Sequence, residues 1–200
     1  MDNKKILKEI EEYIKNPKSG ENEGDEQYSF VALKPSQTNT TGAGVILESL
    51  APTDFKIVYF GPAIYTEKNV QTHYKEIFDG YVADPNGKFK FYPELLEYLT
   101  RGPIYGFIIK GKNAVKGVKA ICGATKNPAP GTMRYELFKI LNIPYDINEN
   151  GIHASGEVDE AKREIANFIS AALVFPKDNP NMDNITNFIK NYKAPEANER

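Results

Sequence analysis

Apolar residues recur at helical spacing near the start of the chain. Residues 3–15 carry Ile6 and Ile10 among lysines and glutamates, and this spacing predicts an amphipathic helix that ends at Asn16-Pro17. Residues 18–27 are polar and contain glycine without a hydrophobic pattern, which predicts a flexible linker. The pattern leaves two roles open for the helix: it docks on the following domain or on a partner, or it stays a mobile extension.

Short apolar runs bounded by turn residues predict β-strands. Three of them are Tyr28–Lys34, stopped by Pro35, then Phe55–Phe60, closed by Gly61-Pro62, and Ile104–Ile109. A fourth strand is expected in the short apolar approach to His153.

The segments between these strands carry helical periodicity instead. We expect helices at residues 42–50, 66–78 with Thr66 as N-cap, 93–99, 113–121 and 157–171, and a short last helix capped by Asp183 or Asn184. Two stretches lack the pattern. Residues 79–90 contain the turn sequence Asp84-Pro85-Asn86-Gly87 and predict an excursion from the fold, and residues 124–150 predict a long loop with several prolines.

The order of these elements is β-α-β-α-α-β-α-loop-β-α. Few strands separated by helices predict an α+β protein, in which an antiparallel sheet is covered by helices. We divide the chain into three parts: an N-terminal helix and linker at 1–27, one domain at 28–176, and a tail with a short helix at 177–200.

The composition excludes a general affinity for nucleic acid or anionic lipid. The chain has 25 basic and 27 acidic side chains and a net charge of −2, so an anionic ligand needs a local cluster of cations. Cys122 is the single cysteine, which excludes an internal disulfide and a cysteine-rich metal site. No apolar run reaches the roughly 20 residues that span a bilayer, and no signal-type core follows Met1. We expect a cytoplasmic protein.

Imidazole is scarce, because the chain contains 2 histidines. One of them stands in Asn150-Gly151-Ile152-His153-Ala154-Ser155, and an acidic amphipathic segment follows directly. Neutral imidazole is nucleophilic near pH 7, since its unperturbed pKa is about 6.5, and it can carry a group covalently between two substrates. An isolated histidine is nevertheless more often structural, and this is what we expect of His73.

Six further motifs precede the histidine motif in a defined order. They are Ala32-Leu33-Lys34-Pro35, His73-Tyr74, Phe91-Tyr92, Gly102-Pro103, Gly123-Ala124-Thr125 and Pro130-Gly131-Thr132-Met133-Arg134. With these motifs, residues 30–168 resemble nucleoside diphosphate kinase. The resemblance implies a ferredoxin-like βαββαβ fold and assembly as a hexamer or tetramer. It also implies ping-pong transfer of the γ-phosphate from a nucleoside triphosphate such as ATP to a nucleoside diphosphate, through a phosphohistidine.

The resemblance implies a set of catalytic residues. His153 matches the phosphorylated nucleophile, and Glu164 matches the carboxylate that orients its ring, although the sequence alone favours a solvated helix residue at that position. Tyr74 and Ser155 match hydroxyls near the transferred phosphate. Lys34 matches a lysine that reaches the phosphates and the ribose, which suits a transfer that depends on positioning and charge neutralisation.

Nucleotide binding is implied in the same way. The matching residues are Thr125, Arg134 and Lys119 for the phosphates, Asn150 for a sugar hydroxyl, Tyr92 and Ile147 for the two sides of the base, and again Lys34. Stacking reads no base edge, so a broad choice of nucleobase is expected. Mg²⁺ would arrive with the nucleotide rather than on a protein cage, so no metal-ligating residue is expected.

Several positions depart from the family pattern. Lys119 stands where most relatives have an arginine, so a point charge replaces a bidentate fork. Residues 79–90 and 135–149 also look longer than usual. These departures keep a second function open, that of a catalytically weakened relative that binds nucleotides or acts as a scaffold. A third, an RNA-binding ferredoxin-like module, conflicts with the balanced charge and the missing aromatic RNP signature.

We expect a homo-oligomer, most simply a hexamer, with a tetramer or dimer as alternatives. Residues 45–47 and 57–59 are apolar, which suits a two-fold contact through the early helix and the second strand. Assembly of dimers into a ring depends on residues 124–150, whose length has changed.

Overall fold

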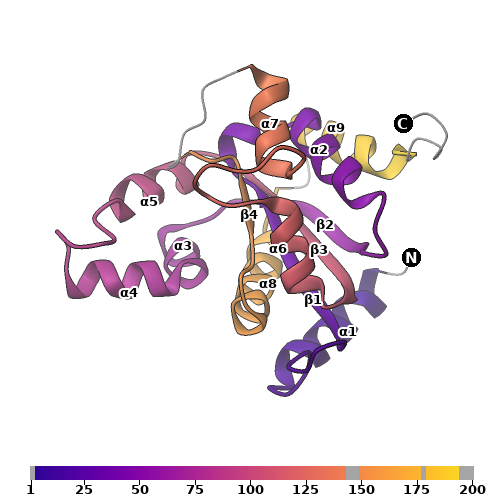
Figure 1. Ribbon diagram of the computed structural model, residues 1–200, viewed down its shortest axis with the longest axis horizontal. Coiled ribbons are helices and arrows are strands. Elements are labelled where there is room, and N and C mark those ends of the chain that lie inside the picture. Colours follow the sequence, from indigo (N-terminus) through magenta and orange to yellow (C-terminus); the bar gives the residue numbers. More distant parts are fainter. Residues whose placement is uncertain (1–2, 143–148, 177–178, 194–200) are drawn as a thin grey trace.

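The computed structural model describes residues 3–142, 149–176 and 179–193. A four-stranded sheet lies at its centre (Figure 1), and its strand order is β2-β3-β1-β4. The strands are β1 (Glu26–Leu33), β2 (Lys56–Ala63), β3 (Ile104–Lys112) and β4 (Ile152–Ala154). Every neighbouring pair is antiparallel. The predicted α+β class with an antiparallel sheet is therefore confirmed.

Helices connect the strands and cover both faces of the sheet. They are α1 (Asn3–Lys15), the 3-10 turn η1 (Pro35–Gln37), α2 (Thr40–Leu50), α3 (Glu67–His73), α4 (Lys75–Ala83), α5 (Tyr92–Thr100), α6 (Ala114–Cys122), α7 (Met133–Leu141), α8 (Val158–Ala172) and α9 (Pro180–Asn191). Among the described residues, no helix has both the length and the apolar character needed to cross a membrane.

The residues of β1 divide between two hydrophobic clusters, because successive side chains of a strand point to opposite faces. Val31 and Leu33 belong to a cluster with residues of α2, α6, α7 and α9. Phe30 and Ala32 belong to a second cluster with residues of α1, α5 and α8. Helices cover both faces, so β1 is buried at every position after Glu26 and is apolar from Phe30 to Leu33.

The edge strand β2 is longer than the sequence predicted. It continues through Gly61-Pro62, where we expected it to close, and Pro62 is paired with Tyr105 of β3. Proline lacks the N–H that an inner strand needs for a second neighbour, but β2 has a neighbour on one side only. The edge position therefore explains why proline does not end this strand.

The helix predicted at 66–78 is two helices. Thr66 caps α3 as predicted, with its side chain accepting from the backbone N–H of Asn69. The backbone then leaves helical geometry at Tyr74, with φ −103° and ψ 43°. The following helix α4 runs on to Ala83, into the stretch that we expected to be an excursion.

Two further helix predictions need correction. The segment 124–150, predicted as a loop, contains α7, whose Met133 and Leu137 are fully buried at a spacing of one helical turn. The last helix begins earlier than expected, because Asn179 caps it with its side chain and Pro180 occupies the first turn.

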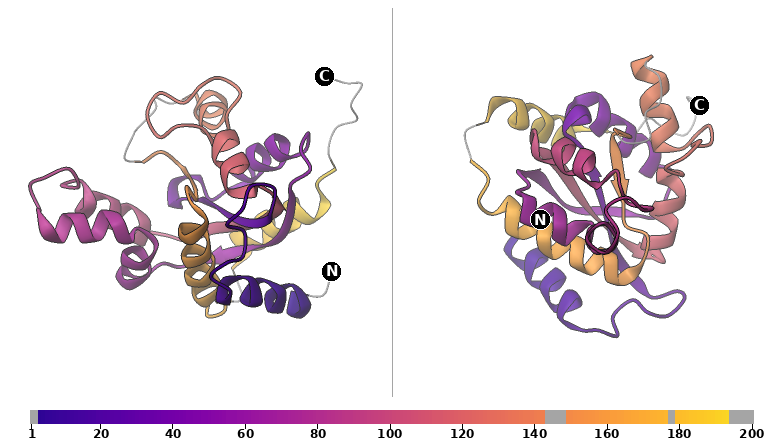
Figure 2. Two further views of the ribbon diagram at one scale, coloured as in Figure 1. Left: turned by 60° about the horizontal axis from the view of Figure 1, so that its bottom comes forward. Right: turned by 90° about the vertical axis from the view of Figure 1, so that its left-hand side faces the viewer.

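Both terminal segments pack against the central domain (Figure 2). On α1, Ile6 and Ile10 are buried in the second hydrophobic cluster, so this helix docks on the domain. The segment that we expected to be a flexible linker is tied at Gly24, whose N–H donates to Asn113 Oδ1 at 2.7 Å. On the opposite face of the sheet, α9 buries Ile185 and Ile189 in the same cluster as residues 45–47, which we had expected to face another subunit.

Candidate active site

A cavity of about 260 Å³ lies beside β4. Side chains from several elements line it: Lys34, Tyr74, Ile77, Phe91, Leu95, Lys119, Thr125, Arg134, Asn150, Ile152, His153 and Ala154. One side combines cations and the imidazole, and the other is an apolar wall from α4 and the start of α5. Such a cavity suits a ligand with an anionic end and a flat apolar end.

The short strand β4 carries His153 into this cavity. His153 is paired with Ala32 of the inner strand β1 and stands between the buried residues Ile152 and Ala154. The approach depends on Gly151, which has φ +73° and whose carbonyl accepts from the N–H of Lys34 at 2.8 Å. A Cβ at Gly151 would lie 2.7 Å from Gln37 Cγ, so only glycine fits there without strain.

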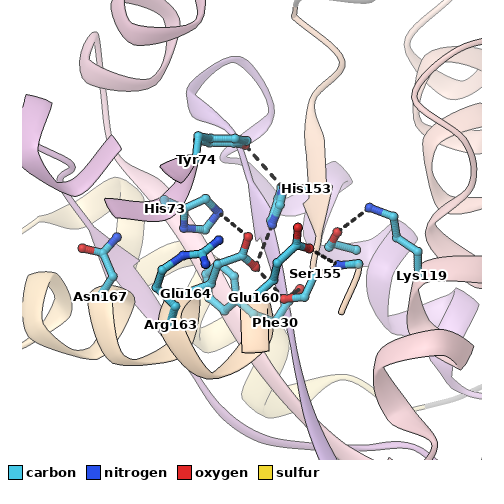
Figure 3. Close-up of polar contacts among 12 residues, drawn as sticks. Phe30, His73, Tyr74, Lys119, His153, Ser155, Glu160, Arg163, Glu164 and Asn167 are labelled. Carbon is cyan, nitrogen blue, oxygen red and sulfur yellow. Dashed lines mark hydrogen bonds and ion pairs between the residues drawn. The ribbon is translucent and has the colours of Figure 1, made fainter. Parts of the chain in front are cut away.

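The imidazole of His153 is held between a carboxylate and a phenol (Figure 3). Its Nε2 lies 2.9 Å from Oε2 of Glu164, and its Nδ1 lies 3.4 Å from the hydroxyl of Tyr74. Ser155 Oγ donates to the same Glu164 oxygen at 2.5 Å. A carboxylate only accepts hydrogen bonds, so Nε2 carries the ring proton and Nδ1 keeps its lone pair.

The environment keeps this imidazole neutral. Burial lowers the pKa of His153 well below its ordinary value, and the cations of Lys34, Lys119 and Arg134 lower it further. Burial also raises the pKa of Glu164, but the donors facing it and the nearby cations favour its ionised form. The site therefore presents an unprotonated nitrogen at neutral pH.

Three cations converge on the cavity. Lys34 Nζ donates to Asn150 Oδ1 at 3.0 Å, and burial, followed by the charge of Arg134, lowers the pKa of this ammonium to about 7. Arg134 Nη1 donates to the carbonyl of Asn150 at 3.1 Å. Lys119 Nζ donates to the carbonyl of Ala154 at 2.7 Å. Nothing in the described lining is acidic, so this positive charge fits a polyphosphate.

Magnesium has no oxygen cage in this cavity, since carboxylates are missing from its described lining. The atoms that gather nearest to the imidazole are two histidine nitrogens and one carboxylate oxygen, from His73, His153 and Glu164. Magnesium prefers six oxygen ligands and keeps several waters. The residues present therefore fit a metal that enters on phosphate oxygens rather than one held by protein.

The family model described as nucleoside diphosphate kinase matches residues 27–174. This chain is a member of the nucleoside diphosphate kinase family. A nucleoside diphosphate kinase from Methanosarcina mazei is 32% identical over 143 residues, which cover 70% of this chain and 85% of that protein. One from Methanocorpusculum labreanum is 35% identical over 150 residues, which cover 73% and 90%.

Solved structures of nucleoside diphosphate kinases share the fold. The Aquifex aeolicus kinase matches with a TM-score of 0.56 and 23% identity, covering 76% of this chain and 96% of the other. The Encephalitozoon cuniculi kinase matches with a TM-score of 0.59 and 22% identity, covering 75% and 92%. Together with the sheet described above, these likenesses bear out the ferredoxin-like fold predicted for this member of the family.

The structure brings together most of the site residues that the resemblance to nucleoside diphosphate kinase implied. Seven of them line the cavity: His153, Tyr74, Lys34, Lys119, Thr125, Arg134 and Asn150. Glu164 contacts His153, and Ser155 donates to Glu164. Ile147 lies outside the described residues. Tyr92 is the exception, because it is buried with its ring 5.4 Å from that of Phe78 and outside the described lining.

Sequence reasoning missed the apolar wall and one neighbour of the nucleophile. The wall is formed by Phe91, Leu95 and Ile77, and Phe91 takes the place beside the cavity that we had assigned to Tyr92. Because Tyr92 is the first residue of α5, its side chain turns inward while Phe91 precedes the helix. His73 has its ring centroid 4.5 Å from that of His153, although the sequence offered no reason to pair them.

Proposed function

We propose that this protein is a nucleoside diphosphate kinase that transfers a phosphoryl group through His153. The observation that carries the proposal is the pairing of His153 Nε2 with Glu164, which leaves Nδ1 unprotonated beside a cationic cavity. A neutral imidazole nitrogen in that position is a nucleophile at physiological pH. The other residues then supply positioning and charge.

The transfer takes place in two symmetrical halves. The Nδ1 lone pair of His153 forms a bond to the γ-phosphorus, and the bond from that phosphorus to the β-phosphate oxygen breaks. Its electron pair stays with the nucleoside diphosphate, which leaves. A β-phosphate oxygen of a second diphosphate then attacks the phosphorus, and the N–P bond returns its electrons to the imidazole. The Nε2 proton remains on the side of Glu164 throughout, so the ring needs no proton exchange with water.

The cations neutralise the phosphates while this occurs. Lys34, Arg134 and Lys119 reach into the cavity from three different elements. The Tyr74 hydroxyl lies 3.4 Å from Nδ1; burial raises its pKa, so it stays a proton donor near the transferred group. Such a loose transition state depends on charge stabilisation rather than on acid–base chemistry. A magnesium ion brought in with the nucleotide would supply further charge neutralisation.

The apolar wall fits the nucleobase. Phe91, Leu95 and Ile77 offer surface without a hydrogen-bonding group, and an aromatic ring stacks on any base. This wall supports the expectation of broad base specificity. We therefore assign the stacking contact with the base to Phe91, in place of Tyr92.

Incubation with γ-labelled ATP tests the proposal. We expect an acid-labile, base-stable phosphoprotein whose label passes to added nucleoside diphosphate. The His153→Asn variant should bind ADP but take no label, and mass spectrometry should locate the phosphate on His153 in the unchanged protein. A chain that binds ADP and never takes label would instead be the weakened, nucleotide-binding relative. Label that stays in the variant, or sits on His73, would refute the assignment.

We also propose a cytoplasmic homo-oligomer. The free thiol of the buried Cys122 is consistent with a reducing compartment. A hexamer is expected from the resemblance, with a tetramer or dimer as alternatives. Because α9 covers the face of α2, a two-fold contact would use the free edge of β2 instead. Light scattering across a dilution series measures the mass, and a value near 22.4 kDa at micromolar concentration would refute assembly.

A further inference from the structure

A second histidine faces the carboxylate that orients the nucleophile. His73, at the end of α3, places Nε2 3.6 Å from Oε1 of Glu164, the oxygen that His153 and Ser155 leave unused. Figure 3 shows its ring turned toward that carboxylate, next to His153. On its other side, His73 Nδ1 lies 3.2 Å from the hydroxyl of Tyr65. Tyr65 and His73 are only 2% and 3% exposed, so water does not compete for these contacts.

The protonation states along this chain of contacts follow from what each group can donate. An ionised Glu164 only accepts, so His73 must turn a protonated Nε2 toward it. Its Nδ1 is then a bare acceptor, and the Tyr65 hydroxyl must donate to it. Burial and the neighbouring charge of Glu164 raise the pKa of Tyr65, and burial lowers the pKa of His73 to about 3. Both groups are therefore neutral and keep this arrangement.

The distance between His73 and Glu164 is longer than that of a full hydrogen bond, but both groups are buried. An N–H dipole that points at a carboxylate in a poorly solvated interior interacts strongly, because little water screens it. The elements are also fixed, since Asn69 on α3 and Asn167 on α8 exchange hydrogen bonds of 2.9 and 3.0 Å. The ring of His73 is therefore held at a fixed position relative to the carboxylate of Glu164.

We propose that Tyr65 and His73 are positioning residues that hold the Glu164 carboxylate and so fix the tautomer of His153. The proposal rests on the function proposed above, because it assigns a use to that tautomer. With Oε1 held by His73, Oε2 stays directed at Ser155 and at His153 Nε2. Without the Tyr65 donor, His73 Nδ1 loses its hydrogen bond, and the ring is no longer held from that side with its Nε2–H toward Oε1. The carboxylate would then be free to rotate, and the nucleophile would lose its alignment.

Charged groups from the surrounding elements share this region. The carboxylate of Glu164 also interacts electrostatically with the cations of Arg163 on its own helix and of Lys119 on α6. His73 interacts in the same way with Lys34, which follows β1. These cations favour the ionised carboxylate whether or not Tyr65 is present. Removal of the Tyr65 hydroxyl therefore removes the hydrogen bond to His73 Nδ1 without changing the net charge of the site.

Kinetics on isosteric variants test the proposal. Tyr65→Phe and His73→Phe should lower kcat at least about fivefold, the factor of one neutral hydrogen bond, with KM for ATP within about twofold, because neither residue lines the cavity. His73→Gln places an amide N–H near the position that Nε2 of His73 occupies in the wild-type protein. Its kcat should therefore be higher than that of His73→Phe. Tyr105→Phe, which removes a buried hydroxyl that bonds Thr186 at 2.7 Å away from the site, is the matched control.

Nitrogen NMR of the ring atoms gives a readout that packing alone would not change. The chain has 2 histidines, so the spectrum of His73→Gln contains ring signals from His153 only. The comparison with the wild-type protein then assigns the signals of both rings. Near pH 8 both rings of the wild-type protein should be protonated at Nε2. In Tyr65→Phe the Nδ1 signal of His73 should shift because it loses its donor, and His153 should also populate the form protonated at Nδ1 because Glu164 is no longer held. An unchanged His153 tautomer with unchanged kcat, or an equal kcat loss in Tyr105→Phe, would overturn the proposal. If the proposed function itself is wrong, the wild-type protein takes no label on His153, and this result distinguishes that failure from failure of the present proposal.

Discussion

Replacement of Lys34 by methionine should stabilise the protein while it removes activity. The ammonium of Lys34 is buried and donates to Asn150 Oδ1 at 3.0 Å. Burial and the charge of Arg134 lower its pKa from 10.5 to about 7. Methionine has a similar shape without the charge. The substitution therefore removes the energetic cost of holding a cation in this site when no phosphate is bound.

The size of the effect follows from the pKa. A drop from 10.5 to about 7, at about 1.36 kcal/mol for each pKa unit, corresponds to roughly 5 kcal/mol of folding free energy. Methionine also loses the hydrogen bond to Asn150, which offsets about 1–2 kcal/mol. We expect Lys34→Met to raise the free energy of unfolding by about 3 kcal/mol at pH 6.5, with the nucleotide absent.

The gain should depend on pH in a defined direction. Below pH 7 the lysine is protonated in both the folded and the unfolded chain, so its cost is complete. Between pH 7 and 10.5 the unfolded chain binds more protons, and the unchanged protein becomes more stable relative to the variant as pH rises. Near pH 9.5 the remaining penalty of about 1 kcal/mol is similar to the contribution of the lost hydrogen bond, so the two proteins should be about equally stable.

Urea unfolding at pH 6.5 and 9.5 measures this difference. The buffers must lack phosphate and sulfate, which would bind the ammonium, and the protein concentration must be constant because assembly also stabilises. Lys116→Met, the same replacement at an exposed position of α6, controls for the change of residue type. If Lys34→Met is destabilising at pH 6.5, or if its effect is the same at both pH values, then burial of the ammonium is not costly and the reasoning is wrong.

Three further substitutions test the cavity and the core. Phe91→Ala should weaken ADP binding in calorimetry by about 1–3 kcal/mol, and an unchanged affinity would return the base contact to Tyr92. Lys119→Arg should tighten ADP binding by at most about 1–1.5 kcal/mol, and weaker binding would contradict the gain from a fork. Gly106→Ala places a Cβ 2.5 Å from Phe168 and should lower the unfolding free energy by about 1–3 kcal/mol, a prediction that an unchanged urea midpoint contradicts.

The sequence by itself determined the class of fold and singled out His153, the nucleophile that we propose. Strand and helix periods are local properties, so β1, β3, α5 and α8 appear within a few residues of their predicted ranges. The motif around His153 is a continuous run of residues, and such a motif can be recognised without any knowledge of distant contacts.

The ends of several helices and strands depend on contacts with other elements and not on the neighbouring sequence. Proline at 62 reads as a strand end, but it is tolerated because β2 has only one neighbour in the sheet. The periodicity of α7 is hidden between prolines, and burial of Met133 and Leu137 against α2 and β4 shows its helical face. The pattern of residues within a segment does not indicate where that segment lies in the sheet.

Only the tertiary structure decided which side chains share the site. Glu164 looks like a solvated helix residue, and it is buried because the ring of His153 and the imidazole of His73 arrive from other elements. Phe91 and Tyr92 are neighbours of similar chemistry, and the first turn of α5 alone decides which ring faces the cavity. Contacts between residues far apart in the chain depend on how the helices dock on the sheet. Local periodicity does not determine that docking, because it arises from the packing of the whole core.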